Sequence, residues 1–437
     1  MVVEKIREEY KMTELGEIPV EWEVSNLKSI SEFITKGSTP TTYGFEWVKE
    51  GILFLKSDCV TDNGFKIGSA MRISKEAHDF MKRSKVKSGD ILLSITGNIG
   101  RPCIIPDYIE EANINQHVAR IRINSLNLNN KFIYHYLCRS EVKKNYEKIK
   151  TGLAYPQISL EQVRNTVIPI PTLKEQQKIA DIVSIADEKI EIAENLIEKT
   201  KELKKGLMQR LLTKGIGHER FKDTEIGKIP EEWNVESLND ISAKYKNSIV
   251  DGPFGSNLKT CDYVEEGILV MQSNYITGGK FELRDVRYIS ENKAKELERS
   301  KVKSGDILMA KIGANFGRAE IIPENIKYGI LSSNSLKIDL NELIAMNSFY
   351  IFVLKSYKKN GTIDKLASTT AQPALSLKAI KNLKVAVPSL NEQKKIASIL
   401  SSVDEKIDQY ESQKDKLQEL KKGLMQNLLT GKIRVKV

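Results

Sequence analysis

The chain has few of the residues from which metal centres and disulfide frameworks are built. Four cysteines (Cys59, Cys103, Cys138 and Cys261) and four histidines are scattered over 437 residues. No CxxC pair occurs, which excludes a metal or redox site of that type and argues against a disulfide framework. We therefore expect neither a bound metal ion nor structural disulfides.

Long apolar runs are absent as well. No stretch reaches the roughly 18 residues of a membrane-spanning helix, and residues 1–11 are too charged for the apolar core of a signal peptide. We expect a cytoplasmic protein that has no membrane partner.

The familiar catalytic motifs are missing too. The sequence contains no GxxxxGK[ST] phosphate loop, no GxGxxG dinucleotide motif, no HExxH zinc motif and no Asn/Asp-Pro-Pro-Tyr/Phe methyltransferase motif. Their absence from so long a chain favours a binding protein over an enzyme, with no cofactor bound by this chain.

Positive charge is in excess. Lysine and arginine number 68 against 58 acidic residues, which gives a formal net charge of +10. A basic protein of this kind is expected to bind a polyanion, and nucleic acid is the first candidate.

What the chain does contain is one pattern written twice, over residues 1–216 and 217–437. The helical ends of the two copies match closely, whereas the polar, loop-rich parts before them match only in blocks. The matching segments, first copy and then second, are 16–22 and 227–233, 84–92 and 300–308, 175–180 and 392–397, and 202–209 and 419–426. This unevenness predicts that a common partner meets the same face twice while the remaining parts recognise two different things.

The first part of each copy predicts a mixed domain. In the first copy, short β-rich runs at 52–55, 90–95 and 118–123 alternate with Gly, Asn and Asp turns, and a helical pattern covers 131–150. We interpret each first part as an α+β domain of about 170 residues.

The last part of each copy predicts a long helix. Thr172 with Glu175, and Ser389 with Glu392, form capping boxes that each follow a proline. Apolar or small residues then recur every seven positions, and the pattern ends near Gly215 and Gly431. A helix of about 40 residues is about 60 Å long.

Each helix has one apolar stripe, and the two stripes are most simply buried against each other. We therefore expect an intramolecular, antiparallel coiled coil with a pseudo-two-fold axis; two separate oligomerisation helices are the alternative. The candidate residues for the coil and for partner docking are Ile179, Ile190, Leu203, Gly206, Leu207, Ile396, Ile407, Leu420, Gly423 and Leu424.

Two features of these helices have competing interpretations. Glycine inside a helix costs about 1 kcal/mol relative to alanine, so Gly206 and Gly423 suggest close approach of either the sister helix or a docked subunit. A tolerated defect near a helix end is the alternative. The acidic residues at 187–188 and 404–405 are expected on a solvated helix face.

Glycine loops that follow strands are the best local candidates for contact with nucleic acid. They lie at 94–101 and 310–318. Glycine lets the backbone approach a phosphate or a base edge, arginine can pair with guanine, and asparagine can recognise adenine. A tight hairpin with an exposed arginine is the alternative interpretation.

Three further pairs of segments occupy equivalent places: 35–43 and 251–259, 115–117 and 332–334, and 151–157 and 368–374. They are polar enough to line a DNA backbone or to present amides and hydroxyls to bases. Tyr155 and Gln372 occupy one position with different chemistry, as two readers of different sequences would. The alternatives are that these segments are plain surface loops, that His117 has a structural role, and that Tyr155 and Gln372 differ through ordinary sequence drift.

The candidate DNA-binding residues of these loops are, in the first copy, Lys36, Ser38, Thr39, Thr96, Asn98, Arg101, Gln116, His117, Tyr155 and Gln157 and, in the second copy, Ser256, Asn257, Lys259, Lys311, Asn315, Arg318, Ser333, Asn334 and Gln372.

In these motifs the chain resembles the specificity subunit of type I restriction-modification systems. The resemblance rests on Gly-x-Ile-Pro-x-x-Trp, on Ser-Gly-Asp-Ile-Leu with its following glycine loop, and on Gly-Pro-Phe-Gly-Ser at 252–256. It also rests on Pro-x-x-x-Glu-Gln-x-x-Ile before a helix that ends in Lys-Lys-Gly-Leu-Met-Gln. Their order and duplication over essentially the whole chain make the resemblance specific.

The resemblance implies a division of the chain into target-recognition domain 1 (1–171), helical spacer 1 (172–215), target-recognition domain 2 (216–388), helical spacer 2 (389–431) and a C-terminal tail (432–437). Each domain would recognise one half of a split site in double-stranded DNA, and the helices would set the gap. The first glycine loop is one residue shorter than the second, so the two reading loops need not share one register.

Partners and cofactors also follow from the resemblance. The helices would dock two modification subunits, which carry S-adenosylmethionine and methylate adenine. Restriction subunits would add translocation and cleavage that depend on ATP and Mg²⁺. None of this chemistry would belong to the chain itself. A coiled-coil scaffold that binds no DNA and a stand-alone DNA-modifying enzyme with unrecognised motifs remain the alternatives.

Overall fold

The chain folds into two compact units. The computed structural model describes residues 9–124, 127–152, 154–255, 257–277, 279–313, 315–367 and 374–436. Unit 1 comprises Met1–Glu194 and Glu411–Val437, and unit 2 comprises Asn195–Tyr410. The boundary between the units falls inside two long helices, α6 (Leu173–Lys214) and α10 (Leu390–Leu428). Each unit therefore contains one globular part together with a portion of both helices.

The described part of unit 1 has two main sheets of four strands. Antiparallel neighbours form the first sheet, whereas β5 and β12 run parallel in the second. In sheet order the strands are β11 (Pro102–Ile104), β10 (Ile91–Ser94), β13 (Val118–Ile123) and β4 (Ser31–Lys36), then β8 (Met71–Ile73), β5 (Trp47–Leu55), β12 (Glu111–Ile114) and β9 (Lys85–Lys87). The strands predicted at 52–55, 90–95 and 118–123 are confirmed.

Unit 2 repeats this plan within its described residues. Its second sheet again holds one parallel pair, β20 with β27. In sheet order the strands are β18 (Ile249–Asp251), β28 (Ser335–Ile338), β25 (Ile307–Ala310) and β26 (Ala319–Ile321), then β19 (Tyr263–Val264), β23 (Tyr288–Ile289), β20 (Ile268–Met271), β27 (Tyr328–Leu331) and β24 (Lys301–Lys303).

Short two-stranded sheets complete both units. They pair β1 (Tyr10–Thr13) with β2 (Gly16–Pro19), β3 (Glu23–Asn26) with β14 (Val167–Ile170), β6 (Val60–Thr61) with β7 (Gly64–Phe65), β15 (Phe221–Thr224) with β16 (Gly227–Pro230), β17 (Asn234–Ser237) with β29 (Lys384–Val387), and β21 (Ile276–Thr277) with β22 (Lys280–Phe281). Mixed sheets with separate helices confirm the predicted α+β class.

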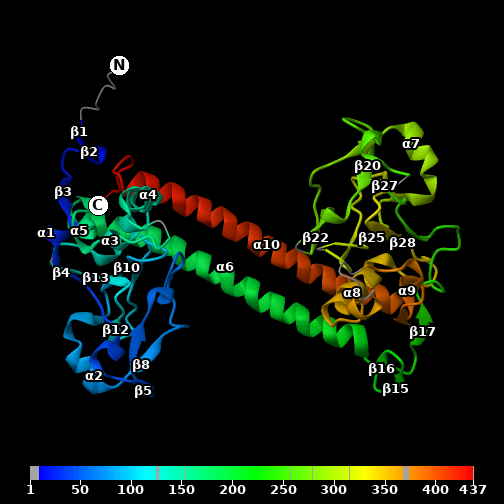
Figure 1. The fold of residues 1–437 in the computed structure, drawn as a ribbon, viewed down its shortest axis with the longest axis horizontal. Helices are drawn as coiled ribbons and strands as arrows, with labels where there is room; N and C mark the ends of the chain where they lie inside the picture. The colour runs from blue at the N-terminus through cyan, green and yellow to red at the C-terminus, as the bar shows by residue number, and fades with distance from the viewer. Residues whose placement is uncertain are drawn as a thin grey trace. The chain divides into compact units, whose positions relative to one another are not determined.

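In unit 1, three of the shorter helices lie beside one end of the long helix α6 (Figure 1). Figure 1 shows α3, α4 and α5 gathered at the start of α6 in unit 1. The shorter helices are α1 (Leu27–Ile30), α2 (Lys75–Phe80), α3 (Asn130–Leu137), α4 (Ser140–Ile149), α5 (Leu160–Arg164), α7 (Glu291–Glu296), α8 (Asn347–Lys359) and α9 (Leu377–Lys381). No helix within the described ranges is both long and apolar enough to cross a membrane.

The helical pattern predicted over 131–150 is confirmed, although a break divides the segment into two helices. The helix α3 ends at Leu137, and Arg139 adopts extended backbone angles (φ −65°, ψ 139°) before α4 begins. The Arg139 guanidinium then lies over the Tyr136 ring, 5.1 Å from its centroid. The corresponding segment of unit 2 continues as one helix, α8.

Portions of α6 and α10 run antiparallel inside each unit, which supports the expected intramolecular helix pair. In unit 1, Ile179 and Val183 of α6 share a core with Met425 and Leu428 of α10. Further along, Asp187 of α6 pairs with Lys421 of α10, so rising numbers on one helix meet falling numbers on the other.

The same pairing recurs in unit 2 with the helices exchanged. Leu211 of α6 shares a core with Ile396 and Leu400 of α10, and Lys204 of α6 pairs with Asp404 of α10. The expectation of a solvated face is confirmed for Glu188 and Glu405, which are exposed, whereas Asp187 and Asp404 each lie half-buried against a lysine of the opposite helix.

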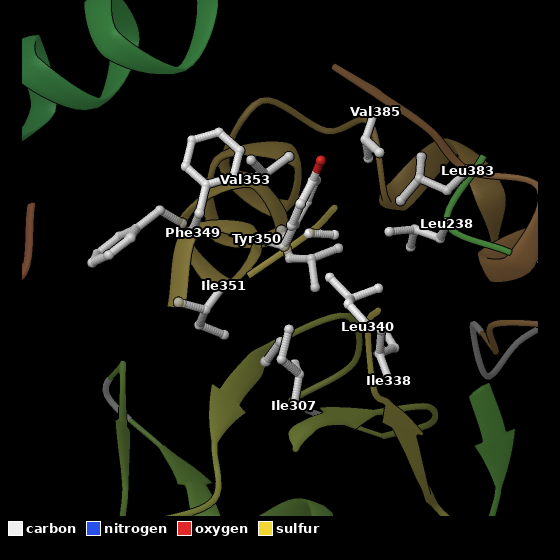
Figure 2. Packing of buried hydrophobic residues seen from close by; sticks show 14 of the residues in the cluster. Leu238, Ile307, Ile338, Leu340, Phe349, Tyr350, Ile351, Val353, Leu383 and Val385 are labelled. Carbon is white, nitrogen blue, oxygen red and sulfur yellow. The ribbon is translucent and has the colours of Figure 1, made fainter. Parts of the chain in front are cut away.

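The core of unit 2 lies between α8 and the sheet that contains β25 and β28. Phe349, Tyr350 and Val353 of α8 gather above Ile307 and Ile338 of the sheet (Figure 2). These side chains are buried, and burial contributes about 25 cal/mol per Å² of apolar surface, so the helix is held mainly by this face.

Only half of each predicted capping box forms. The hydroxyl of Thr172 accepts a bond from the Glu175 amide at 3.4 Å, and Ser389 does the same for Glu392 at 3.3 Å. The two glutamate side chains do not fold back onto their own caps. Glu175 Oε2 instead accepts the indole N–H of Trp22 at 3.0 Å, a residue from the GxIPxxW motif.

Unit 2 repeats this contact with Glu392 and Trp233 at 2.9 Å. A basic side chain that follows the end of the opposite helix completes each site: Arg434 on Glu175, at 2.6 Å, and His218 on Glu392, at 2.9 Å. The carboxylates therefore connect three distant segments, which explains why the repeat retains both glutamate and tryptophan.

Candidate nucleic-acid interface

In unit 1, the predicted loop at 35–43 lies directly against the loop at 115–117. The Gly37 amide donates to Asn115 O at 3.1 Å, and a Cβ on Gly37 would lie 1.7 Å from Ile114 O. Only glycine fits this approach. Beyond it, Thr39 Oγ1 donates to Gln116 Oε1 at 2.7 Å, which brings two candidate residues together.

The glycine loop at 94–101 joins the same surface. Ile95 N donates to His117 O at 2.9 Å, Gly97 N donates to Pro156 O at 2.8 Å, and Thr96 forms a β-bridge with Gln157. Four loops that are separated in sequence thus converge at one end of the two sheets.

A polar cavity of about 240 Å³ lies among these loops. Five of the candidate residues line it: Thr96, Asn98, Arg101, His117 and Tyr155. Ser57, Asp58 and Thr61, which the sequence did not single out, line its other side. The convergence of several hydroxyls with one side-chain amide and one guanidinium suits hydrogen bonding to base edges or phosphates.

Arg101 has a counterion that the sequence did not reveal. Its Nη2 lies 2.7 Å from Asp62 Oδ2, and Lys143 Nζ lies 3.0 Å from the other oxygen of the same carboxylate. Arg101 Nε is buried and has no hydrogen-bond partner in the described part of the chain. Asp62 sits in an ordinary Thr-Asp-Asn-Gly turn, so no sequence signal indicated this role.

The candidates of unit 1 differ in exposure. Lys36, Asn98, Gln116, Tyr155 and Gln157 are exposed, whereas Ser38, Thr39, Thr96, Arg101 and His117 are half-buried. The Tyr155 side chain is 75% exposed. An exposed aromatic ring next to a polar cavity is available for stacking or for a sugar contact.

Deeper in the sheet, Arg120 illustrates how unit 1 accommodates buried charge. Burial, followed by the positive charge of Arg122, lowers the pKa of Arg120 to about 10. Its guanidinium lies 4.1 Å from the centroid of the Phe33 ring and donates to Thr35 Oγ1 at 3.1 Å. The residue is 4% exposed, so we assign it to the fold and not to the interface.

The equivalent loops converge in unit 2. A Cβ on Gly252 would lie 1.8 Å from Ser332 O, just as a Cβ on Gly37 would lie 1.7 Å from Ile114 O. Lys311 N donates to Asn334 O at 2.7 Å, and Ile312 forms a β-bridge with Ala374. The architecture of the candidate surface is therefore the same in both units.

The charges on the two surfaces are different. Lys36 precedes the glycine in unit 1, whereas a buried aspartate, Asp251, precedes it in unit 2. Asp251 binds Lys311 Nζ at 2.7 Å and Arg299 Nη2 at 3.0 Å. Lys311 is thus partly neutralised by a residue that the sequence did not indicate.

Other candidates of unit 2 are more accessible. Asn257, Lys259, Arg318, Ser333 and Asn334 are exposed, and Asn315 is half-buried with its Nδ2 3.5 Å from Ser273 O. Ser256 and Gln372 lie outside the described residues.

The candidate coil and docking residues divide by burial. Ile179, Ile396 and Ile407 are buried, Ile190, Leu207 and Leu424 are half-buried, and Leu203 and Leu420 are each 55% exposed. A Cβ on Gly206 or Gly423 would meet nothing within 4 Å. Close approach of the sister helix is therefore wrong as the reason for these glycines, whereas a docked subunit remains a prediction.

Comparison with known proteins gives one family. The model of the type I restriction modification DNA specificity domain matches the chain twice, at residues 19–202 and 230–422. The MjaX specificity subunit of a type I restriction enzyme from Methanocaldococcus jannaschii is 30% identical, over 98% of this chain and 97% of that protein. The MjaVIII specificity subunit from the same organism is 28% identical, over 96% and 94%.

Solved structures with the same fold come from the same type of system. The S subunit of a type I restriction-modification system from M. genitalium has a TM-score of 0.59 at 18% identity, over 93% of this chain and 96% of that one. A chain from a study of complex assembly and conformational transition of the type I R-M system has a TM-score of 0.56 at 17% identity, over 95% and 99%.

Proposed function

Because the chain belongs to the family of type I restriction-modification specificity subunits, we propose that it selects the DNA site for a complex with methyltransferase and restriction subunits. Specificity subunits are non-catalytic DNA-recognition proteins, which sets aside the alternative of a stand-alone DNA-modifying enzyme. In this proposal each unit presents one target-recognition domain to one half of a split DNA site.

One observation carries the proposal for DNA recognition. Loops from equivalent places of the repeat converge in each unit, four in unit 1 and three in the described part of unit 2, around a glycine that touches a neighbouring backbone, Gly37 or Gly252. The side chains on the loops around these two glycines differ. Lys36 of unit 1 is replaced by Asp251 in unit 2, and Asn115-Gln116-His117 is replaced by Ser332-Ser333-Asn334. A constant frame with variable donors and acceptors suits two different half-sites.

The helices support the second half of the proposal, the docking of two identical methyltransferase subunits. Residues 202–209 and 419–426 have the same sequence, and Leu203 and Leu420 are equally exposed on them. The open space beside Gly206 and Gly423 allows a partner backbone to approach closely. Two equal faces suit two copies of one partner.

Binding to random and cognate duplexes tests DNA recognition directly. The chain with its methyltransferase subunit should shift a duplex in a gel, and the affinity should fall steeply as salt rises because phosphate contacts release counterions. A complex that forms but shifts no duplex at low salt would support the scaffold alternative instead.

Sequencing of methylated adenines in a host that carries the system should give one bipartite motif. Insertion of seven residues at matching places in α6 and α10 adds about 10 Å of helix, or about three base pairs at 3.4 Å each. We expect a longer gap with unchanged half-sites. New half-sites with the original gap would contradict the assignment of the helices as the spacer.

A further inference from the structure

A carboxylate at the same position of both repeats has an arginine partner in unit 1 but none among the described residues of unit 2. In unit 1, Asp90 and Arg122 lie next to the cross-strand pair Ile91 and Ile121 of β10 and β13. Arg122 holds the carboxylate with two bonds of 2.7 Å, from Nε to Oδ1 and from Nη2 to Oδ2. Such bidentate pairs are among the strong hydrogen bonds of proteins.

The register of the strands identifies the counterparts in unit 2. Ile307 pairs with Ile338, as Ile91 does with Ile121, and both point into the core in Figure 2. The neighbouring residues are Asp306 and Asp339, so an aspartate replaces the arginine. Like charges on opposite strands are destabilising unless something neutralises them.

The two oxygens of Asp306 differ in their hydrogen bonds. Asp306 Oδ2 accepts the Lys303 amide at 2.8 Å, as Asp90 Oδ2 accepts the Lys87 amide at 2.9 Å. Asp306 Oδ1 is the counterpart of Asp90 Oδ1, which accepts a bond from Arg122 Nε in unit 1. Asp306 Oδ1 is buried without a hydrogen-bond partner among the described residues. Asp306 is 0% exposed, and an unsatisfied buried acceptor costs about 1–3 kcal/mol.

The charged groups around Asp306 do not supply the missing bond. Tyr245 donates its hydroxyl to Asp339 Oδ2 at 2.5 Å, and Lys303 Nζ lies 3.5 Å from the same oxygen. Lys337, the counterpart of Arg120, has its Nζ 3.4 Å from the Tyr245 hydroxyl. Burial, only partly offset by the Lys303 amide, raises the pKa of Asp306 to about 6.

A cavity of about 620 Å³ opens beside the two carboxylates. Its lining is three carboxylates (Asp306, Asp339 and Glu342), two lysines (Lys303 and Lys394) and the apolar side chains of Ile321, Met346 and Leu390. Its size suits a side chain or a small ligand rather than a water molecule. Acidic groups beside an apolar wall match a cation that is carried on an aliphatic stem.

We propose that this cavity of unit 2 binds a guanidinium group, which takes the place that the Arg122 side chain fills in unit 1. The group would form the missing bond to Asp306 Oδ1 and would separate the charges of Asp306 and Asp339. An arginine of a partner protein and a free small guanidine share this chemistry.

A metal ion is a poorer occupant. Within the described ranges no cluster of three or more His, Cys, Asp or Glu side chains is placed to hold one. A lysine ammonium would match the charge but not the two-bond geometry that the Asp90–Arg122 pair shows, because only guanidinium presents a planar pair of donors.

Calorimetric titration of the full chain tests the site with four probes: methylguanidinium, methylurea as its neutral analogue, N-acetyl-arginine amide and N-acetyl-lysine amide. We expect the two guanidinium probes to bind once per chain, about tenfold or more tightly than their analogues. If methylguanidinium alone suffices, a free guanidine can occupy the cavity; if only the arginine amide binds, a protein side chain is required. Equal binding of the neutral or lysine analogues would overturn the proposal.

Two variants keep the test specific. Asp306→Asn retains the shape and the acceptor for the Lys303 amide, and we expect it to weaken guanidinium binding about tenfold or more. Asp339→Arg recreates the unit 1 pair, so the variant should raise Tm and abolish probe binding. If Asp306→Asn binds the probes as tightly as the wild type, the chain has no such site. Probe binding that survives Asp339→Arg leads to the same conclusion.

Discussion

Asp187 of α6 and Lys421 of α10 form an ion pair in unit 1, with 2.5 Å between Oδ1 and Nζ. The residues 217 positions away form the reverse pair in unit 2, with Lys204 on α6 and Asp404 on α10, also at 2.5 Å. Each helix therefore donates one lysine and one aspartate, and neither pair depends on residues of the other unit.

Removal of either ion pair should lower the free energy of unfolding by a small amount, which should be the same for both pairs. Because the side chains are 21–35% exposed, we expect a coupling free energy of about 0.5–1 kcal/mol for each pair in a double-mutant cycle with alanine. Urea unfolding measures it, and the two cycles should be additive because they share no partner. The exposed Lys189→Ala variant serves as the control. A coupling energy indistinguishable from zero in both cycles would show that the pairs merely accompany the apolar packing.

Arg434 should stabilise unit 1 through Glu175. Arg434→Ala leaves a buried carboxylate with the Trp22 indole as its remaining described partner, so the free energy of unfolding should fall by about 1–3 kcal/mol. The second change Glu175→Gln should recover part of this loss, because it replaces the buried and now unpaired carboxylate with a neutral amide. Lys432→Ala is the matched control in the same segment. Equal effects of Arg434→Ala and Lys432→Ala would contradict the contact.

His135 should make unit 1 less stable in mild acid. Burial, assisted by the charges of Lys421 and Lys131, lowers the pKa of His135 from 6.5 to about 3. Below about pH 6.5 the unfolded chain takes up a proton that the folded chain refuses. This contribution to stability is therefore present above pH 6.5 and is lost as the pH falls towards 3, by about 1.4 kcal/mol per pH unit.

The variant His135→Phe measures this term, because Phe352 occupies the equivalent position of α8 in unit 2. The difference in unfolding free energy between pH 7 and pH 5 should become smaller than in the wild type. Phe352→His is the reciprocal control and should add the same dependence to unit 2. An unchanged pH profile in both variants would show that the histidine is not excluded from protonation.

Arg122 should stabilise unit 1 through its bidentate pair with Asp90. Arg122→Ala leaves the buried Asp90 without its bidentate partner, and we expect a loss of about 2–4 kcal/mol. Methylguanidinium at millimolar concentration should restore part of Tm by filling the vacated position. Arg83→Ala, an exposed arginine of the same unit, should lose little and show no rescue. Rescue of both variants to the same extent would indicate a general effect of the salt.

The two glycine-loop arginines should differ in DNA binding. Arg318 is exposed, whereas Arg101 is held by Asp62. We expect Arg318→Ala to weaken binding of the cognate duplex about tenfold and to change the salt slope by about one. Arg101→Ala should change the slope less, because its charge is already paired. Fluorescence anisotropy over a salt series measures both, and identical slopes for the two variants would contradict the distinction.

The periodic parts of the fold could be predicted from the sequence. The seven-residue stripes and the helix caps predicted α6 and α10. The bonds of Glu175 and Glu392 could not be predicted, because a capping box is a local pattern while the Trp22 indole lies 153 positions away from Glu175.

The counterions of the candidate interface were hidden for a related reason. Asp62 and Asp251 occupy turn and strand-end positions where aspartate is common, so nothing local distinguishes them. Their importance arises only when tertiary packing places Arg101 and Lys311 beside them. Which loop residues contact bases stays a prediction for the same reason.

The division of the helices between the units also affects the order of folding during synthesis. Unit 2 is one continuous segment, Asn195–Tyr410, but unit 1 needs residues from both ends of the chain. Met425, Leu428 and Leu429 complete its core, and they are translated after all of unit 2. Domains generally fold from the N-terminus as they emerge. Here we expect the reverse sequence of events: the first segment of unit 1 keeps an open apolar surface until the segment that follows unit 2 has been translated.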